Sequence, residues 1–245
     1  MRQPDHWDAV FFDIGGVVVS LPSIRQGYAD FLAEFAADRG LDPGEAIEEW
    51  RAALGDYFNA ADGTEYLPAR DGYREAFRAI THDGLDDEAW VPGFEAATAA
   101  AMAPEPSAVE TIRELAEYDL HLGIVSDIDT WEAERMLDAF GVADAFDAIT
   151  TSEAVGYKKP DRRMFADALD KAGVPPGRAL HVGDRYEHDM QGATRTGIQT
   201  VAYNGTATEA VADATRDGHR VLDDPAVDYA VEDLRDLLAV VGRSE

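Results

Sequence analysis

Residues 9–16 have the sequence Ala9-Val10-Phe11-Phe12-Asp13-Ile14-Gly15-Gly16, an apolar run that ends in an acid and two glycines. An apolar run bounded by glycine is typical of a buried parallel strand. Asp13 would then lie at the carboxyl end of the strand, where open α/β sheets bind their ligands. The two glycines would let the backbone approach a bound anion closely. Asp13 is therefore a candidate nucleophile; the alternative is a carboxylate that caps the next turn.

A second apolar segment, residues 120–125, is followed by Ser126 and Asp127. We expect a strand here, with the hydroxyl of Ser126 at its end. A serine in that place can donate a hydrogen bond to a phosphate oxygen, as can the backbone N–H groups after it. The alternative is that the two residues cap a turn or the helix predicted at 130–140, since serine and aspartate are common caps.

Lysine is rare in this chain, and two of its three lysines are adjacent in Gly156-Tyr157-Lys158-Lys159-Pro160-Asp161. Pro160 fixes the local backbone, and Asp161 is predicted to be the N-cap of a helix. A lysine held at this point can neutralise a carboxylate and a phosphate together. A solvated basic turn is the alternative.

A further strand is predicted at residues 179–183, and the acids Asp184 and Asp189 follow it. Mg²⁺ prefers oxygen ligands and usually takes one or two protein carboxylates together with waters and substrate phosphate. Asp184 suits that role at the strand end, and Asp189 would lie about one turn into the next helix. An acidic helix start, stabilised by the helix dipole, is the alternative and fits Asp189 better than Asp184.

These four segments occur in the order Asp, Ser, Lys, Asp…Asp, each at or near a predicted strand end. In this respect the chain resembles the haloacid dehalogenase-like (HAD) superfamily of hydrolases. The segments FFDIGGVV, IVSD, GYKKP and HVGDRYEHD are similar to its four motifs, in sequence order. Four ordered motifs in their expected contexts are far more specific than any one of them alone.

The resemblance implies a role for each matching residue. Asp13 would be the nucleophile, and Lys159 would pair with it and with the phosphate. Ser126 would bind the transferring phosphoryl group, and Asp127 and Gly16 would belong to the same substrate-binding set.

The resemblance also implies a Mg²⁺ cofactor. Asp13, the backbone carbonyl of Gly15 and Asp184 would bind the ion, and Asp189 would be a further ligand or lie immediately outside the ligands.

Gly15 is the point at which the sequence departs from the phosphatases of this family, which usually carry a second aspartate there as general acid and base. The carbonyl ligand survives the change, but the proton donor does not. Dehalogenase members also lack that aspartate, yet they typically carry an aromatic residue and need no metal. We therefore expect a Mg²⁺-dependent hydrolase of small phosphomonoesters that forms an aspartyl-phosphate on Asp13. A weak or inactive relative that binds a phosphorylated ligand is the alternative, and a 2-haloacid dehalogenase is a further one.

The composition bounds the setting in which the protein works. The 245 residues are 46% apolar, which suits one large domain or a core with a smaller insert. The formal net charge is −28, from 49 acidic and 21 basic residues. No basic stretch is large enough to bind nucleic acid or an anionic membrane. A strongly acidic chain with almost no lysine is typical of a salt-loving organism, because high salt screens the self-repulsion.

The absence of cysteine excludes a disulfide framework and a thiolate metal site. Residues 1–8 are polar and lack the apolar region of a signal peptide, and no run approaches the length of a membrane span. We therefore expect a cytoplasmic protein, a monomer or homodimer, whose partner is a small phosphorylated metabolite rather than nucleic acid or membrane.

Residues 23–102 carry helical patterns and little strand character, with helices expected at 24–35, from 43, at 68–80 and at 86–102. Four helices between the first and second motifs resemble the cap of many HAD hydrolases, which would close over the site and exclude water. Candidate substrate contacts in this insert are Tyr57, Glu65, Tyr66, Arg70 and Arg74, with solvated helix faces as the alternative.

The remainder of the chain alternates between the two kinds of element. Helices are predicted at 105–117, 130–140, 161–172 and 187–196, strands at 120–125, 146–150, 179–183 and 198–202, and a last helix at 230–242. This alternation predicts an α/β fold, a Rossmann-like parallel sheet with helices on both faces. We expect residues 1–22 and 103–245 to form the catalytic core and residues 23–102 to form the α-helical cap.

Overall fold

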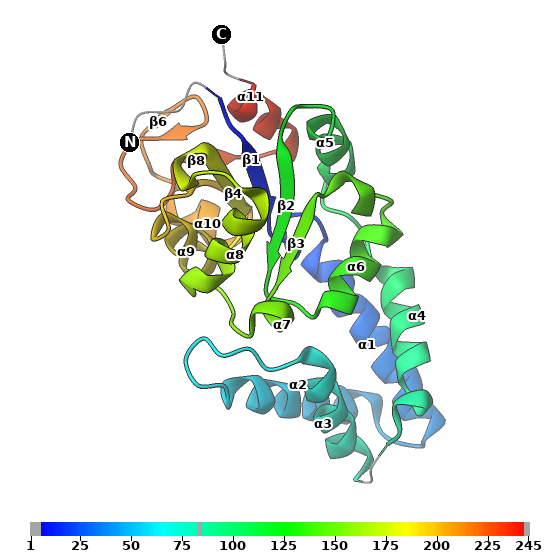
Figure 1. Cartoon of the computed structure of the whole chain (residues 1–245). Helices are drawn as coiled ribbons and strands as arrows, with labels where there is room; N and C mark the ends of the chain where they lie inside the picture. The colour runs from blue at the N-terminus through cyan, green and yellow to red at the C-terminus, as the bar shows by residue number, and fades with distance from the viewer. Residues whose placement is uncertain (1–5, 83–84, 243–245) are drawn as a thin grey trace. The chain divides into compact units, whose positions relative to one another are not determined.

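The computed structural model describes residues 6–82 and 85–242. Residues 1–5, 83–84 and 243–245 lie outside this description, so the predicted polar amino terminus is described only from His6. The chain divides into two compact units (Figure 1). One unit is Ser20–Ala103, and the other combines the segment that ends at Val19 with the segment that begins at Pro104.

Within the described residues, the larger unit is built on one eight-stranded sheet. Its strands are β1 (Ala9–Phe12), β2 (His121–Ser126), β3 (Ala148–Thr151), β4 (Ala179–Gly183), β5 (Gln199–Tyr203), β6 (Arg216–Asp217), β7 (Arg220–Val221) and β8 (Tyr229–Val231). Their order across the sheet is β3-β2-β1-β4-β5-β8-β7-β6. The strands from β3 to β8 are parallel, whereas β7 and β6 form an antiparallel extension.

The direction in which the chain fills the sheet reverses beside β1. This strand pairs with β2 on one side, where Ala9 lies opposite His121, and with β4 on the other, where Ala9 lies opposite Ala179. Because parallel crossovers are right-handed, the helices that precede and follow β2 cover one face, and those that follow β3 and β4 cover the other. The carboxyl ends of β1 and β4 therefore flank the switch point, where such sheets bind ligands.

The helices of this unit pack on both sides of the sheet. They are α5 (Ala108–Leu115), α6 (Thr130–Ala139), α7 (Ser152–Val155), α8 (Arg162–Ala172), α9 (Gly192–Thr194), α10 (Gly205–Ala210) and α11 (Leu237–Val241), with single turns η2 (Ala143–Ala145), η3 (Pro176–Arg178), η4 (Tyr186–Gln191) and η5 (Leu234–Asp236). Phe11 packs in one buried cluster with Phe165 of α8. Its neighbour Phe12 meets the ring of Phe146 instead, because successive strand residues point to opposite faces. The α/β prediction is confirmed.

The carboxyl-terminal part of the prediction is wrong. The sequence pattern predicts one helix over 230–242, but the structure has β8 at its start and α11 only from Leu237. Tyr229, Ala230 and Val231 are buried and pair with β5. Pairing with β5 on one side and β7 on the other thus overrides the local helical pattern. The helix predicted at 187–196 is likewise divided into the π-helical turn η4 and the short α9.

The smaller unit is helical, as predicted. Its helices are α1 (Leu21–Asp38), α2 (Pro43–Asn59), α3 (Ala69–Thr81) and α4 (Val91–Ala101), with the turn η1 (Asp87–Ala89) before the last. Asp42 caps α2, since its side chain accepts the N–H of Glu45 at 2.9 Å, and Pro43 begins the helix, where a missing N–H costs nothing.

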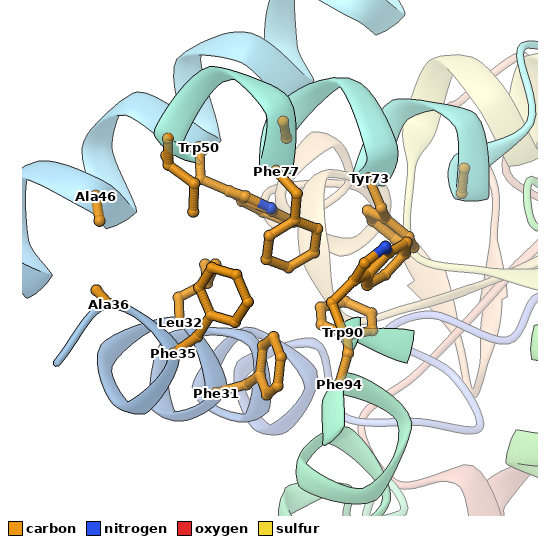
Figure 2. Close-up of a cluster of buried hydrophobic side chains, with 13 residues drawn as sticks. Phe31, Leu32, Phe35, Ala36, Ala46, Trp50, Tyr73, Phe77, Trp90 and Phe94 are labelled. Carbon is orange, nitrogen blue, oxygen red and sulfur yellow. The ribbon is translucent and has the colours of Figure 1, made fainter. Parts of the chain in front are cut away.

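This helical unit has a core of its own, and Figure 2 shows that it is mostly aromatic. The buried cluster comprises Phe31, Leu32, Phe35, Ala36, Ala46, Trp50, Ala69, Tyr73, Ala76, Phe77, Ile80, Trp90 and Phe94. The ring centroids of Phe77 and Trp90 lie 4.6 Å apart, and Trp50 stacks on Tyr73 with 5.9 Å between the ring centroids. Large rings bury much apolar area per residue, so they can support a small unit. None of the described helices is both long and apolar enough to cross a membrane.

Candidate active site

Asp13 and Asp184 lie together at the switch point of the sheet, directly after β1 and β4. Both are buried, with 3% and 7% of their surface exposed. The N–H of Asp13 donates to the carbonyl of Val182 in β4 at 3.0 Å, and Oδ1 of Asp13 accepts the N–H of Ile14 at 2.8 Å. These bonds fix the carboxylate of Asp13 to the strand end, as the sequence predicts.

The loop after Asp13 requires glycine at position 16. Gly16 has a φ of +76°, which side chains with a Cβ rarely adopt, and a Cβ there would lie 2.6 Å from Oδ2 of Asp184. Its N–H donates to the carbonyl of Val19, the residue with which Gly15 forms a β-bridge. The glycine therefore lets the loop approach Asp184 closely. The predicted contact of Gly16 with substrate stays a prediction.

Lys159 is completely buried, and its ammonium group has three acceptors. Nζ lies 2.6 Å from Oδ1 of Asp189, 3.0 Å from Oδ2 of Asp13 and 3.0 Å from the carbonyl of Val125. Burial alone would lower the pKa of Lys159, but the charges of Asp13 and Asp189 outweigh it, and the pKa is raised. Two of the three N–H donors of this ammonium are used in hydrogen bonds, to Asp189 and to the carbonyl of Val125, and Asp13 is its ion-pair partner.

Asp189, in η4, is the partner that holds Lys159. Its Oδ1 also lies 3.0 Å from Nε2 of the buried His181, and its Oδ2 accepts the backbone N–H of Arg185 at 3.0 Å. Burial alone would raise the pKa of Asp189, but Lys159 and the hydrogen bond with His181 lower it well below the usual range. Three protein groups thus already bind this carboxylate, which leaves it less free than Asp184 to bind a metal.

Asp184 has the opposite environment. Its Oδ1 is buried and has no hydrogen-bond partner among the described residues. Burial, followed by the negative charges of Asp13 and Asp189, raises the pKa of Asp184 to about 7. Within the described part of the chain, each of the three carboxylates offers an oxygen within 4.8 Å of the other two. Clustered buried carboxylates are costly unless a cation joins them, so the group is suited to a hard metal ion.

Ser126 and Asp127 end β2, on the other side of β1. Ser126 is buried. Asp127 does not cap α6, whose N-cap is Asp129. Its Oδ1 accepts instead the backbone N–H of Lys159 at 2.7 Å and the hydroxyl of Ser152 at 3.0 Å. The structure therefore ties Asp127 to the lysine segment, while the predicted roles of Ser126 and Asp127 in substrate binding stay predictions.

Arg185 also lies at the site, although no role is predicted for it from the sequence. Its Nη2 donates to Oδ2 of Asp127 at 2.8 Å and lies 3.9 Å from Oδ2 of Asp13. Nδ1 of His188 is 3.4 Å from the same oxygen of Asp127. Burial alone would raise the pKa of Asp127, but the hydrogen bond with His188 and the charges of Lys159 and Arg185 lower it well below the usual range. Asp127 is therefore ionised and unsuited to donate a proton.

The position of Arg185 beside Asp184 is the only sequence signal that pointed to it. A basic residue at the start of an acidic turn is common, so this signal is weak. The contacts of Arg185 with Asp13 and Asp127 join segments far apart in the chain and therefore cannot be predicted from local sequence. Nothing in the sequence marks His181 as a site residue, because a single histidine within an apolar strand such as β4 is usually a core residue.

Three of the candidate substrate contacts in the insert are engaged within the helical unit itself. Arg70 pairs with Glu95 at 3.2 Å, Arg74 pairs with Asp71 and Asp87, and the hydroxyl of Tyr57 donates to the carbonyl of Pro68 at 3.0 Å. Their contacts with substrate, like those of Glu65 and Tyr66, stay predictions.

Comparison with known proteins shows the family to which the chain belongs. The family model for haloacid dehalogenase-like hydrolases matches residues 7–197, and the chain therefore belongs to this family. Pyrophosphatase PpaX of Oceanobacillus iheyensis is 31% identical, over 96% of this chain and 97% of that protein. The solved structure of a HAD phosphatase from Thermococcus onnurineus superposes with a TM-score of 0.68 at 21% identity, covering 96% of this chain and 98% of that one, and so shares the fold.

A shorter match has a higher identity. Glyceraldehyde 3-phosphate phosphatase of Methanothermobacter thermautotrophicus is 33% identical over 46% of this chain, which covers 50% of that protein. The chain thus spans about half the length of this relative.

Proposed function

We propose that the protein is a Mg²⁺-dependent phosphatase that hydrolyses small phosphomonoesters through an aspartyl-phosphate on Asp13. The observation that carries the proposal is the pairing of Asp13 with the buried Lys159, beside an oxygen of Asp184 that has no partner among the described residues. A fixed carboxylate next to a cation site is what attack on a phosphoryl group requires. The relatives named as phosphatases support this class of reaction.

Magnesium fits the side chains that the strand ends bring together. Asp13, the carbonyl of Gly15 and Asp184 would hold the ion, and Asp189 would orient Lys159 beside it. The support is the unpartnered Oδ1 of Asp184 within a cluster of carboxylates, because Mg²⁺ takes oxygen ligands. When bound, the ion neutralises charge and polarises the phosphoryl oxygens.

The proposed reaction has two displacements at phosphorus. In the first, a carboxylate oxygen of Asp13 attacks, the bond from phosphorus to the ester oxygen breaks, and the alcohol leaves with a proton from solvent or from an acid. In the second, water attacks the phosphorus of the aspartyl-phosphate and loses a proton, so that inorganic phosphate is released and the carboxylate returns. Lys159 would offset the charge of Asp13 as the anion approaches, and Ser126 would bind a phosphoryl oxygen.

Gly15 sets the expected limit of this activity, because it has no side chain that can donate a proton to the leaving oxygen. Turnover should therefore be slow for esters whose leaving oxygen is a strong base. The same residue favours a second candidate function, a nearly inactive relative that binds a phosphorylated ligand. The carboxylate cluster argues against a dehalogenase, whose chemistry needs no metal.

A panel of small phosphomonoesters, assayed with Mg²⁺ in high-potassium buffer, tests the proposal. Wild type should release phosphate from at least one ester, and Asp13→Asn, which keeps the shape but cannot attack phosphorus, should release none. Phosphate binding without turnover by wild type would favour the second candidate, and equal turnover by the two proteins would exclude Asp13 as the nucleophile.

A further inference from the structure

We propose that Arg185 is a second cation, besides Lys159, that contacts the phosphoryl group at Asp13, and that Asp127 holds it in place. The inference rests on the proposed phosphatase function, because it names the group that binds the anion at the same site. It also assigns to Asp127 a positioning role through Arg185, rather than a direct contact with substrate.

The first step of the argument is that Lys159 has few donors left for a phosphate. Its Nζ donates to Asp189 and to the carbonyl of Val125, and it is ion-paired with Asp13 at 3.0 Å. An ammonium has three N–H donors, so at most one of them is left for a phosphate oxygen. A phosphate dianion with several oxygens therefore leaves a place for a second cation beside Asp13.

The second step is that Arg185 has donors to spare and is accessible. Its side chain is 36% exposed, and Nη2 lies 3.9 Å from Oδ2 of Asp13. Among the described residues, its guanidinium donates one hydrogen bond, to Asp127. Because a guanidinium has five N–H donors in a planar fork, the remaining ones can bind two phosphate oxygens at once.

The third step is that Arg185 is fixed both at its backbone and at its guanidinium. The backbone N–H of Arg185 donates to Oδ2 of Asp189, and Nη2 donates to Oδ2 of Asp127. Asp127 is itself fixed by the N–H of Lys159 and the hydroxyl of Ser152. A cation fixed before the substrate arrives loses little freedom on binding it.

The charges of the site point the same way. Asp13, Asp127, Asp184 and Asp189 converge there, and Lys159 and Arg185 form ion pairs with all of them except Asp184. Without Arg185, Asp127 would lose the arginine ion pair that offsets its charge towards an incoming phosphate dianion. The guanidinium thus makes the rim beside Asp127 able to accept an anion.

Calorimetry of inorganic phosphate binding, in buffer that contains Mg²⁺, tests the assignment without requiring turnover. Arg185→Gln should weaken phosphate binding at least tenfold, because charge-assisted bidentate contacts are lost; tenfold corresponds to about 1.4 kcal/mol. The matched control is Arg178→Gln, since Arg178 is 35% exposed and also pairs with one aspartate, Asp8, but lies at the opposite end of β4. It should leave phosphate affinity unchanged.

Two further variants separate contact from scaffolding. Arg185→Lys keeps the charge but loses the fork, so it should bind phosphate with intermediate affinity. Asp127→Asn should weaken binding less than Arg185→Gln does, since the guanidinium remains but is no longer anchored.

Two results would overturn the assignment. If Arg185→Gln and Arg185→Lys lower the melting temperature but bind phosphate as wild type does, Arg185 is only structural. If wild type itself binds no phosphate, the proposed function fails and the assignment of Arg185 fails with it. Failure of the assignment alone is therefore recognised by normal phosphate binding in wild type and in both Arg185 variants.

Discussion

Asp184 carries a carboxyl group whose pKa is raised to about 7, first by burial and then by the charges of Asp13 and Asp189. A carboxyl whose pKa is higher in the folded state stabilises the fold below its unfolded pKa, and this contribution is lost as the pH rises through the folded pKa. In metal-free protein, this group should therefore lower the free energy of unfolding between about pH 4 and pH 7. One pKa unit corresponds to about 1.4 kcal/mol, so the effect is at most a few kcal/mol.

Asp184→Asn should accordingly raise the melting temperature of metal-free protein at about pH 8, but change it little at about pH 5. Thermal unfolding in the presence of a chelator measures both values, with Asp213→Asn, at an exposed aspartate, as the control. An equal shift at the two pH values would show that Asp184 is not held at a raised pKa. Added Mg²⁺ should stabilise wild type and not the variant.

Gly15 permits a second test at the level of one residue. If the missing acid limits the rate, Gly15→Asp should raise turnover of esters with basic leaving oxygens more than that of nitrophenyl phosphate. Positioned acid catalysis is worth about 10²–10⁴-fold and matters most when the leaving oxygen is basic. The measurement is a series of esters with different leaving-group pKa values, hydrolysed by both proteins. Parallel dependence on leaving-group pKa would mean that a donor elsewhere already protonates the alcohol.

At the level of elements, the sequence predicts best the features that depend on local pattern. The apolar runs that end at Phe12 and Gly183 predict strands, and their polar ends predict Asp13 and Asp184 at one edge of the sheet. The helix predicted over residues 230–242 is wrong at its start, because β8 forms by pairing with β5 and not from its local sequence pattern. The sequence pattern also did not identify Arg185 as a site residue, because its contacts are set by tertiary structure.

The turn after β5 shows a strained residue that serves the site. Asn204 has φ +59° and ψ −176°, a conformation that is essentially restricted to glycine. Its side-chain amide lies 3.3 Å from the carbonyl of Gly16 and 3.3 Å from Oε2 of Glu105. The strained backbone therefore places a donor against the loop that follows Asp13.

Asn204→Gly and Asn204→Ala both remove that donor, but only the alanine keeps the strain. We expect the glycine variant to be more stable than the alanine variant by about 1 kcal/mol or more. Both should lower kcat by a similar factor, because both free the Gly16 loop. Melting temperatures and turnover of the two variants measure this. Activity that follows stability across the pair, rather than falling equally, would show that Asn204 has only a structural role.

The whole molecule combines two units, each with a buried core, and a large negative charge. The formal charge of −28 on 245 residues means that like charges repel across the surface. Raising KCl from about 0.1 M to about 1 M shortens the Debye length from ~10 Å to ~3 Å, so the melting temperature should rise and then level off. Sucrose at matched osmolality is the control for excluded-solute effects. A melting temperature that is unchanged or falls in KCl would contradict a salt-adapted surface.

Covalent phosphorylation of Asp13 is the central claim, and chemical trapping tests it most directly. Protein that is turning over nitrophenyl phosphate with Mg²⁺ is quenched in acid and reduced with borohydride, which converts an aspartyl-phosphate to homoserine. Mass spectrometry of the peptide that contains residues 9–16 then locates the change. We predict homoserine at position 13 in wild type and none in Asp13→Asn, which should also show no turnover. Continued turnover with an unmodified Asp13, or homoserine at another aspartate, would contradict the proposed mechanism.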